Sequence, residues 1–151
     1  RYRVTSVSAS LATPFKLGDV GLRYQGQWKA QKAAAVVPPS EFFAIGNRFS
    51  VRGFSGELSL AAEHGASWRN ELAWAAPWQA VASEFYAVLD AGVVRGAASE
   101  QLAGKSLAGA GLGMRARWQG AQFDLAVTQP IRQPDLFERK SAVYATLAYE
   151  F

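Results

Sequence analysis

Apolar and polar residues alternate along most of this chain, and the alternation predicts a set of β-strands. From residue 19 to residue 29, apolar side chains such as Val20, Leu22 and Tyr24 are separated by polar or charged ones. Successive side chains of a strand point to opposite faces, so a period of two indicates a strand with one apolar face. Residues 1–11 are rich in Val, Ser, Thr and Tyr and predict a preceding strand. A short turn at residues 14–16, around Pro14, is expected to join the two.

Five later segments repeat the alternation and bring the expected number of strands to seven. They are residues 67–75, 84–93, 109–118, 122–128 and 143–151. In the second segment Asp90 and Gly92 fall on the polar face. In the third, the polar face carries Gly109, Gly111 and Gly113. Glycine weakens a strand but leaves room for a close approach, so we expect another backbone to pack against this face.

The connections between the expected strands are alternately short and long. Short connections fall near residues 14–16, 77 and 119–120, whereas long ones cover residues 30–57, 96–105 and 130–140. Bacterial outer-membrane barrels have this asymmetry, with short periplasmic turns and long external loops. A soluble up-and-down barrel of the lipocalin type shares the alternation but not the loop asymmetry. The pattern favours an all-β fold, an antiparallel transmembrane β-barrel with Trp28 near a membrane interface.

Composition narrows the possible classes further. The 151 residues contain no cysteine and no run of eighteen apolar residues, which excludes disulfides, thiolate chemistry and a membrane-spanning helix. Sixteen Lys and Arg against twelve Asp and Glu give a net charge of +4. These basic residues are spread along the chain, whereas a nucleic-acid footprint concentrates them on one face. We interpret them as part of a polar barrel interior. Because no initiator Met or signal pattern precedes Arg1, we expect the chain to be a fragment of a larger mature protein.

The long connection at residues 30–57 carries the most distinctive motif, Val51-Arg52-Gly53-Phe54. Glycine permits a sharp backbone excursion at this point, so the loop presents the single charged side chain of Arg52 beside it. The loop is also rich in apolar residues that are costly to leave in water. We therefore expect it to fold back against the barrel wall and occupy the lumen. These apolar residues are Phe42, Phe43, Ile45, Phe49 and Phe54.

Three further motifs follow in order after this loop. Arg69-Asn70-Glu71-Leu72 begins one expected strand, Leu89-Asp90-Ala91-Gly92 lies in the next, and the chain ends on Ala148-Tyr149-Glu150-Phe151. Together with the loop motif, they resemble the C-terminal part of the transporters of two-partner secretion. These form the haemolysin secretion/activation family, typified by the filamentous haemagglutinin transporter, within the outer-membrane assembly superfamily. The family usually has an aromatic residue where this chain has Val88.

The resemblance implies a location, a fold and a set of partners. It predicts a protein of the bacterial outer membrane, with residues 1–151 as the C-terminal strands of a translocator barrel of about sixteen strands. The motif at Val51 to Phe54 would sit at the tip of an inward-folded loop, with Asp90 and Gly92 on the wall opposite it. Phe151 would be an assembly signal for the barrel-assembly machinery. The other implied partners are outer-membrane lipid, a secreted exoprotein of haemolysin or adhesin type, and the remaining strands and periplasmic domains of the same protein.

Enzymatic and cofactor chemistry find little support in the residues. His64 is the single histidine and is expected in a solvated loop, where the neighbouring residues offer one carboxylate and no nucleophile. The run from Gly109 to Gly113 is followed by more strand alternation and not by a helix, so it does not predict a phosphate site. The sequence thus predicts a protein that is not an enzyme and has no cofactor or metal. Two alternatives to protein translocation remain: a factor that inserts other barrels into the membrane, and a passive porin.

Overall fold

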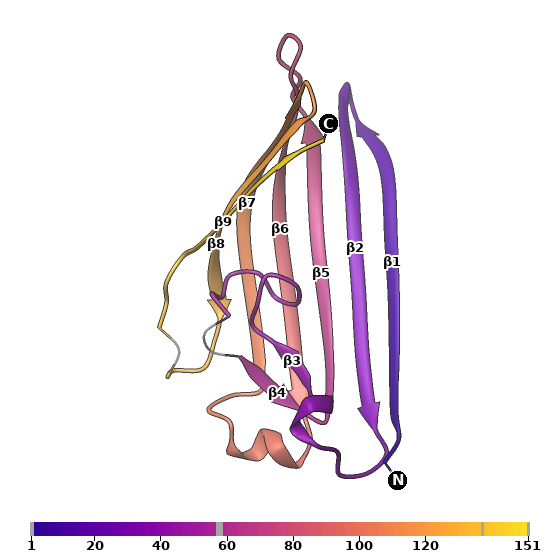
Figure 1. Ribbon diagram of the computed structural model, residues 1–151, viewed down its shortest axis with the longest axis vertical. Helices are drawn as coiled ribbons and strands as arrows, with labels where there is room; N and C mark the ends of the chain where they lie inside the picture. Colours follow the sequence, from indigo (N-terminus) through magenta and orange to yellow (C-terminus); the bar gives the residue numbers. More distant parts are fainter. Residues whose placement is uncertain (1, 57–58, 137, 151) are drawn as a thin grey trace.

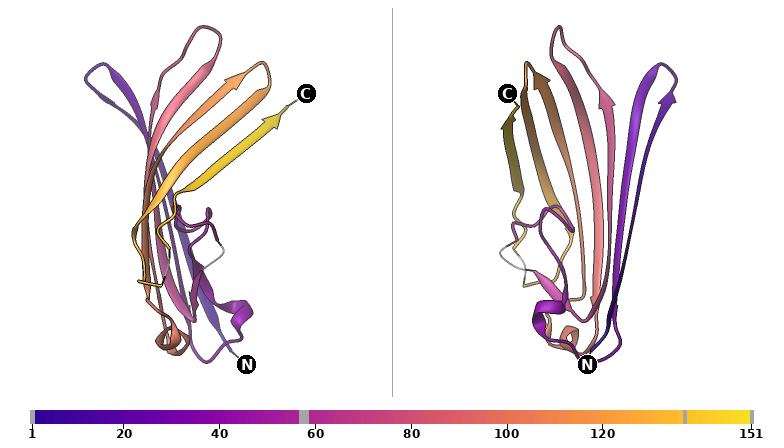
Figure 2. Two further views of the ribbon diagram at one scale, coloured as in Figure 1. Left: turned by 90° about the vertical axis from the view of Figure 1, so that its left-hand side faces the viewer. Right: turned by 45° about the vertical axis from the view of Figure 1, so that its right-hand side comes forward.

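The computed structural model describes residues 2–56, 59–136 and 138–150, and its main feature is a curved, open antiparallel sheet of seven strands (Figures 1 and 2). Each strand pairs with the next in the order β1-β2-β5-β6-β7-β8-β9. The bounds are β1 Val4–Leu17, β2 Val20–Ala33, β5 His64–Ala75, β6 Ala82–Arg95, β7 Ser106–Trp118, β8 Ala121–Arg132 and β9 Ala142–Tyr149. The expected all-β class and the seven strands are confirmed, and the barrel is not closed within this chain.

The connections fall into two sets at opposite ends of the sheet (Figure 1). At one end, residues 18–19, 76–81 and 119–120 form short turns; at the other, residues 34–63, 96–105 and 133–141 form long connections. We call these the short-turn end and the long-loop end. The second long connection contains the 3₁₀ helix η2, Ala97–Gln101. At the turn of residues 119–120 both residues have positive φ, +45° and +84°, as a tight two-residue hairpin turn requires. The predicted alternation of connection lengths is thus confirmed.

Two prolines lie inside strands and correct the predicted boundaries. Pro14 is paired with Arg23 within β1, so the first turn lies at residues 18–19, where Gly18 has a φ of +61°. Pro130 lies in β8 opposite Gly109, next to a shift in the β7–β8 register. Proline lacks an N–H donor and is tolerated in sheets at edge strands and at bulges. Pro130 adjoins a bulge, which explains why it does not end β8.

The two faces of the sheet differ in character, as the alternation predicts. One face, which we call the outward face, exposes large apolar side chains from every strand, including Leu11, Leu72, Leu89, Leu112 and Leu147. Aromatic pairs stack across neighbouring strands on this face: Trp28 with Trp68, and Trp74 with Phe85. The opposite, inward face carries charged and polar side chains. Within the described residues, no helix is long and apolar enough to cross a membrane.

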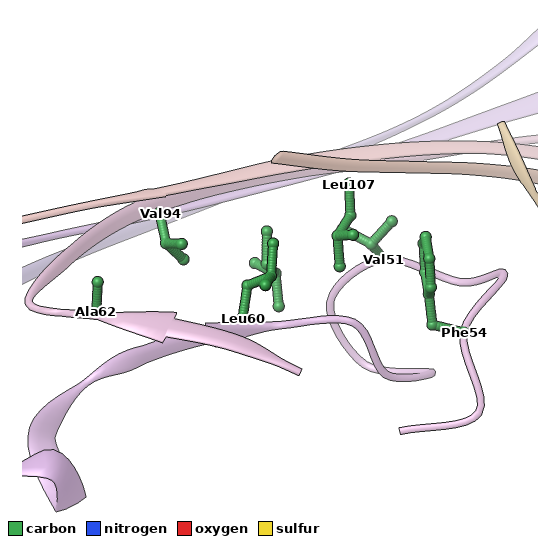
Figure 3. Close-up of a cluster of buried hydrophobic side chains, with 7 residues drawn as sticks. Val51, Phe54, Leu60, Ala62, Val94 and Leu107 are labelled. Atoms are coloured by element: carbon green, nitrogen blue, oxygen red, sulfur yellow. The ribbon is translucent and has the colours of Figure 1, made fainter. Parts of the chain in front are cut away.

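The connection of residues 34–63, which we call the inner loop, lies against the inward face (Figure 2). It contains the 3₁₀ helix η1 (Pro39–Glu41) and a small antiparallel pair of strands, β3 (Phe43–Ile45) and β4 (Leu60–Ala62). An apolar cluster joins this loop to the wall near the long-loop end (Figure 3). Its buried members are Ile45, Val51, Phe54, Leu60 and Ala62 of the loop, with Val94 of β6 and Leu107 of β7.

The inner loop departs from the prediction in three respects. It begins and ends later than predicted, because β2 continues to Ala33 and β4 lies between the motif and β5. Phe49 is not part of the apolar cluster, since 67% of its surface is exposed. His64 does not lie in a solvated loop; it is the first residue of β5, half-buried, and its Nδ1 accepts a hydrogen bond from the Ala33 backbone N–H at 3.1 Å.

Candidate functional site

The tip of the inner loop is shaped by short-range hydrogen bonds. The Ser50 Oγ accepts a hydrogen bond from the Gly46 backbone N–H at 3.1 Å, and the Asn47 Oδ1 accepts one from the Phe49 N–H at 2.9 Å. Side chains of Ser and Asn commonly stabilise turns in this way. Gly53 has a φ of +117°, a conformation that other residues rarely adopt. The turn therefore aims Arg52 at the inward face of the sheet.

Arg52 pairs with Asp90 of β6 through three hydrogen bonds. Its Nε and Nη2 donate to the two oxygens of the Asp90 carboxylate at 2.7 and 2.9 Å, and its backbone N–H donates to Oδ2 at 3.0 Å. Asp90 is 1% exposed and Arg52 is 8% exposed. Bidentate hydrogen bonds between ionised groups are among the strongest in proteins. The pairing implied by the family resemblance is thus present, and it joins the loop tip to the middle of the wall.

Glu71 of β5 is a second acidic partner of the same guanidinium. Arg52 Nη1 donates to Glu71 Oε2 at 3.0 Å, and Nη2 also donates to the Asn70 carbonyl at 3.1 Å. Burial disfavours the charged form of Arg52, but the hydrogen bonds and charges of Asp90 and Glu71 outweigh it and raise the pKa of the guanidinium. Arg52 therefore stays charged in its buried position.

The predicted inward glycines have three different neighbours. A Cβ at Gly109 would lie 1.8 Å from the Arg52 carbonyl oxygen, so this glycine admits the loop backbone. A Cβ at Gly113 would lie 2.1 Å from the ring of Tyr86, its cross-strand neighbour. A Cβ at Gly111 would meet β8, at 2.4 Å from the Val127 carbonyl oxygen. Only the first of the three packs against the inner loop.

Further contacts tie the loop tip to strands on either side of Asp90. A Cβ at Gly92 would lie 2.9 Å from a methyl of Val51, so that position of β6 also receives the loop. The Tyr144 hydroxyl of β9 donates to the Phe54 carbonyl at 2.7 Å. The guanidinium of Arg48 lies 5.7 Å from the centre of the Tyr144 ring. The loop tip thus contacts β5, β6, β7 and β9.

A chain of charges continues along the inward face from Glu71 toward the short-turn end. Arg115 of β7 donates to Glu71 at 2.5 and 3.0 Å, to Glu84 at 3.1 Å and to Asp124 at 3.0 Å. Arg23 of β2 completes the chain through Glu84, at 2.7 Å. The sequence analysis missed Arg115 as the centre of this network. The alternation implies that Arg115 and Glu84 lie on the polar face, but it does not show that they meet, because that depends on the register of β6 against β7.

Phe151, the expected assembly signal, lies outside the described residues. Among the residues that the structure describes, no group of three or more His, Asp or Glu side chains could hold a metal ion.

The fold and the loop together define a class of protein: an outer-membrane β-barrel wall with an inner loop bound to its polar face. Comparisons with known proteins identify the family. The family model described as haemolysin secretion/activation protein ShlB/FhaC/HecB matches residues 1–116, and the chain belongs to this family. It is a family of outer-membrane transporters and not of enzymes.

Individual relatives agree with this assignment. The chain is 35% identical over 141 residues to the outer membrane transporter CdiB-2 of Burkholderia pseudomallei. The aligned region covers 91% of this chain and 24% of the relative. It superposes on CdiB from Acinetobacter baumannii with a TM-score of 0.93 at 30% identity, covering 99% of this chain and 27% of the other. CdiB from Escherichia coli gives a TM-score of 0.81 at 24% identity, covering 98% and 27%, and supports the fold. The chain thus spans about a quarter of the length of these relatives.

Proposed function

We propose that the complete protein translocates an unfolded secreted partner across the outer membrane, and that residues 1–151 form the C-terminal portion of its barrel. The relative described as an outer membrane transporter supports the general activity. The resemblance of the motifs to two-partner secretion supports the finer proposal, a single exoprotein of haemolysin or adhesin type. Recognition of that exoprotein falls to periplasmic domains outside this chain, and no cofactor or covalent step is involved.

In this proposal the inner loop occupies the lumen at rest and is held there by Arg52. The observation that carries it is the buried ion pair of Arg52 with Asp90 and Glu71. Charges are costly to bury unless they are paired and hydrogen-bonded. A loop that projected into the medium would need neither the three buried charges nor the close approach of its backbone to Gly109. The arrangement instead suits a loop with a defined docked position on the wall.

The charged inward face provides a suitable path for an extended polypeptide. Arg23, Glu84, Arg115 and Asp124 form a continuous polar surface on the inward face, between the loop tip and the short-turn end. An unfolded chain carries its own backbone donors and acceptors, which need polar partners or water as it passes. Side chains of both signs offer such partners without selecting one sequence. This surface therefore fits transport of a long, unstructured substrate.

The test is to replace residues 46–56 by a short Gly-Ser linker in the full-length protein and to measure secretion and single-channel conductance. Loss of secretion with larger or unstable conductance is expected, because the lumen loses its docked loop. The matched control is removal of residues 135–140 from another long connection, which should leave conductance unchanged. Unchanged conductance with full secretion in the first variant would contradict the proposal and favour a flexible external loop.

A further inference from the structure

The outward face of the sheet carries charge at one end only. Among the described residues of the seven strands, and apart from His64, the outward rows contain three charged side chains. They are Lys32 of β2, in the row of Trp28, Arg95 of β6, in the row of Val93, and Arg132 of β8, opposite Ala108. All three are basic, all are exposed, and all lie at the long-loop end. The acidic residues of the strands, Glu71, Glu84, Asp90 and Asp124, all face inward.

Arg132 reaches this face because of the irregularity in β8. Pro130 is opposite Gly109, but Arg132 is opposite Ala108, so one extra residue lies between the two pairs. A one-residue shift moves the following side chains to the other face of a sheet. Without the bulge Arg132 would face the lumen. The bulge therefore adds a third cation to the outward row.

The three cations have no ion-pair partner within the described part of the chain, in contrast to Arg52 and Arg115 on the inward face. One strand lies between Lys32 and Arg95, and another between Arg95 and Arg132. Strands are spaced about 4.8 Å apart, so Lys32 and Arg95, which lie on either side of the His64 position, stand about 10 Å apart across the sheet. Arg132 is level with Ala91 through Ala108, so it lies roughly 13 Å further along the strands, beside the aromatic pair of Trp28 and Trp68. A headgroup with more than one phosphate has the width to contact two of them.

An apolar hollow of about 470 Å³ lies beside this basic row, on the same face. The stacked pair Trp28 and Trp68 borders it, and Arg132 is part of its lining. Small residues form its floor, because alanine occupies neighbouring positions on successive strands. These include Ala9, Ala66, Ala91 and Ala108. Because alanine side chains are short, this part of the lipid-facing surface leaves room for acyl chains beside Trp28 and Trp68.

We propose that Lys32, Arg95, Arg132 and this hollow bind a phosphorylated, multiply acylated lipid of the outer leaflet, namely lipopolysaccharide. Long loops of outer-membrane barrels are external, so the basic row lies at the level of the outer-leaflet headgroups. Basic residues at a membrane surface attract anionic headgroups, and the apolar hollow below them takes up acyl chain. Any further strands would extend the sheet from the edges at β1 and β9 and would leave this face toward lipid.

The experiment uses the full-length protein, delipidated and placed in nanodiscs of zwitterionic phosphatidylcholine, and titrates it with purified lipopolysaccharide. The triple variant K32Q/R95Q/R132Q should bind about a hundredfold more weakly than the parent, at about fivefold for each charge removed. The variant Ala108→Trp, which fills the hollow and keeps all charges, should also weaken binding. Native mass spectrometry measures the occupancy of each sample, and a heat-modifiability gel checks that each barrel is folded.

The control variant K16Q/R117Q/R139Q removes the same charge from the inward face and from a loop, away from the hollow, and its binding should stay within about twofold of the parent. Equal weakening in this control would overturn the proposal, because it would show attraction by net charge alone. Unchanged lipopolysaccharide binding by the folded triple variant would also overturn the proposal. The same holds if the triple variant changes the self-association of the protein but not its binding of lipopolysaccharide. Lipid binding is measured without secretion, so its failure is distinguishable from failure of the proposed transport function.

Discussion

Replacing Arg52 by alanine should release the inner loop from the wall. The substitution removes four side-chain hydrogen bonds, two to Asp90, one to Glu71 and one to the Asn70 carbonyl. Loss of one member of a buried ion pair costs about 3–5 kcal/mol, because the other charge is left buried without its partner. Asp90 keeps the Asn70 backbone N–H at 3.1 Å and has Arg69 at 3.9 Å. We therefore expect the lower end of the range, about 3 kcal/mol.

A loss of about 3 kcal/mol corresponds to a change of roughly hundredfold in the ratio of docked to undocked loop. Single-channel recording of the full-length protein in planar bilayers measures this ratio through the fraction of time in the high-conductance state. The double variant of Arg52→Ala with Asp90→Ala completes a mutant cycle. In the double variant no unpaired charge is left between these two positions. Its open fraction should therefore be closer to that of either single variant than to the value expected if the two single effects added.

The matched control is Arg23→Ala, which removes an arginine from the same face but not from the loop. Arg23 pairs with Glu84 and its side chain is 38% exposed, and such pairs contribute about 0–1 kcal/mol. Its conductance should remain near that of the parent. The reasoning fails if Arg52→Ala leaves both the open fraction and secretion unchanged, or if Arg23→Ala opens the pore to the same extent.

Other substitutions test separate parts of the site. Gly109→Ala should undock the loop, because its new methyl group would lie 1.8 Å from the Arg52 carbonyl oxygen. The control is Gly21→Ala, where the new methyl group would have no atom within 4 Å. Equal conductance in the two variants would contradict the predicted overlap. Tyr144→Phe removes the hydrogen bond to the Phe54 carbonyl, and the expected cost of about 1 kcal/mol should raise the open fraction only a few-fold. Deletion of Phe151 should lower the amount of barrel in the outer membrane without changing the activity of each inserted molecule. An immunoblot measures the amount and a secretion assay the activity. Normal abundance would count against an assembly signal at Phe151.

The strands were predictable from the sequence because their signal is local. A row of apolar side chains facing lipid requires apolar residues at every second position, as in Val143, Ala145 and Leu147. The strand ends were less predictable. Proline usually ends a strand, but Pro14 and Pro130 do not; at Pro130 a bulge removes the need for the missing N–H group.

The site was only partly predictable for a different reason. Arg52 and Asp90 stand in motifs whose family resemblance implied that they meet. Arg115 stands in no such motif, and its contacts depend on how β6, β7 and β8 are aligned. Phe49 was expected to be buried because it is apolar, but its position in the turn directs it away from the cluster. Alternation along a chain predicts faces, whereas contacts between side chains require the register of the strands.

The hydrogen bond from Tyr144 to the Phe54 carbonyl joins residues 90 positions apart in sequence. Contacts over such separations form late in folding, because the chain between them must first be ordered. Strands β5 to β9 must therefore be aligned before the tip of the inner loop has all its partners. The loop can begin to settle on β5 and β6, but it becomes fully held only once β9 is in place. Docking of the tip thus marks the completion of this part of the wall, and an intermediate that lacks β9 would hold the loop tip through β5, β6 and β7 alone.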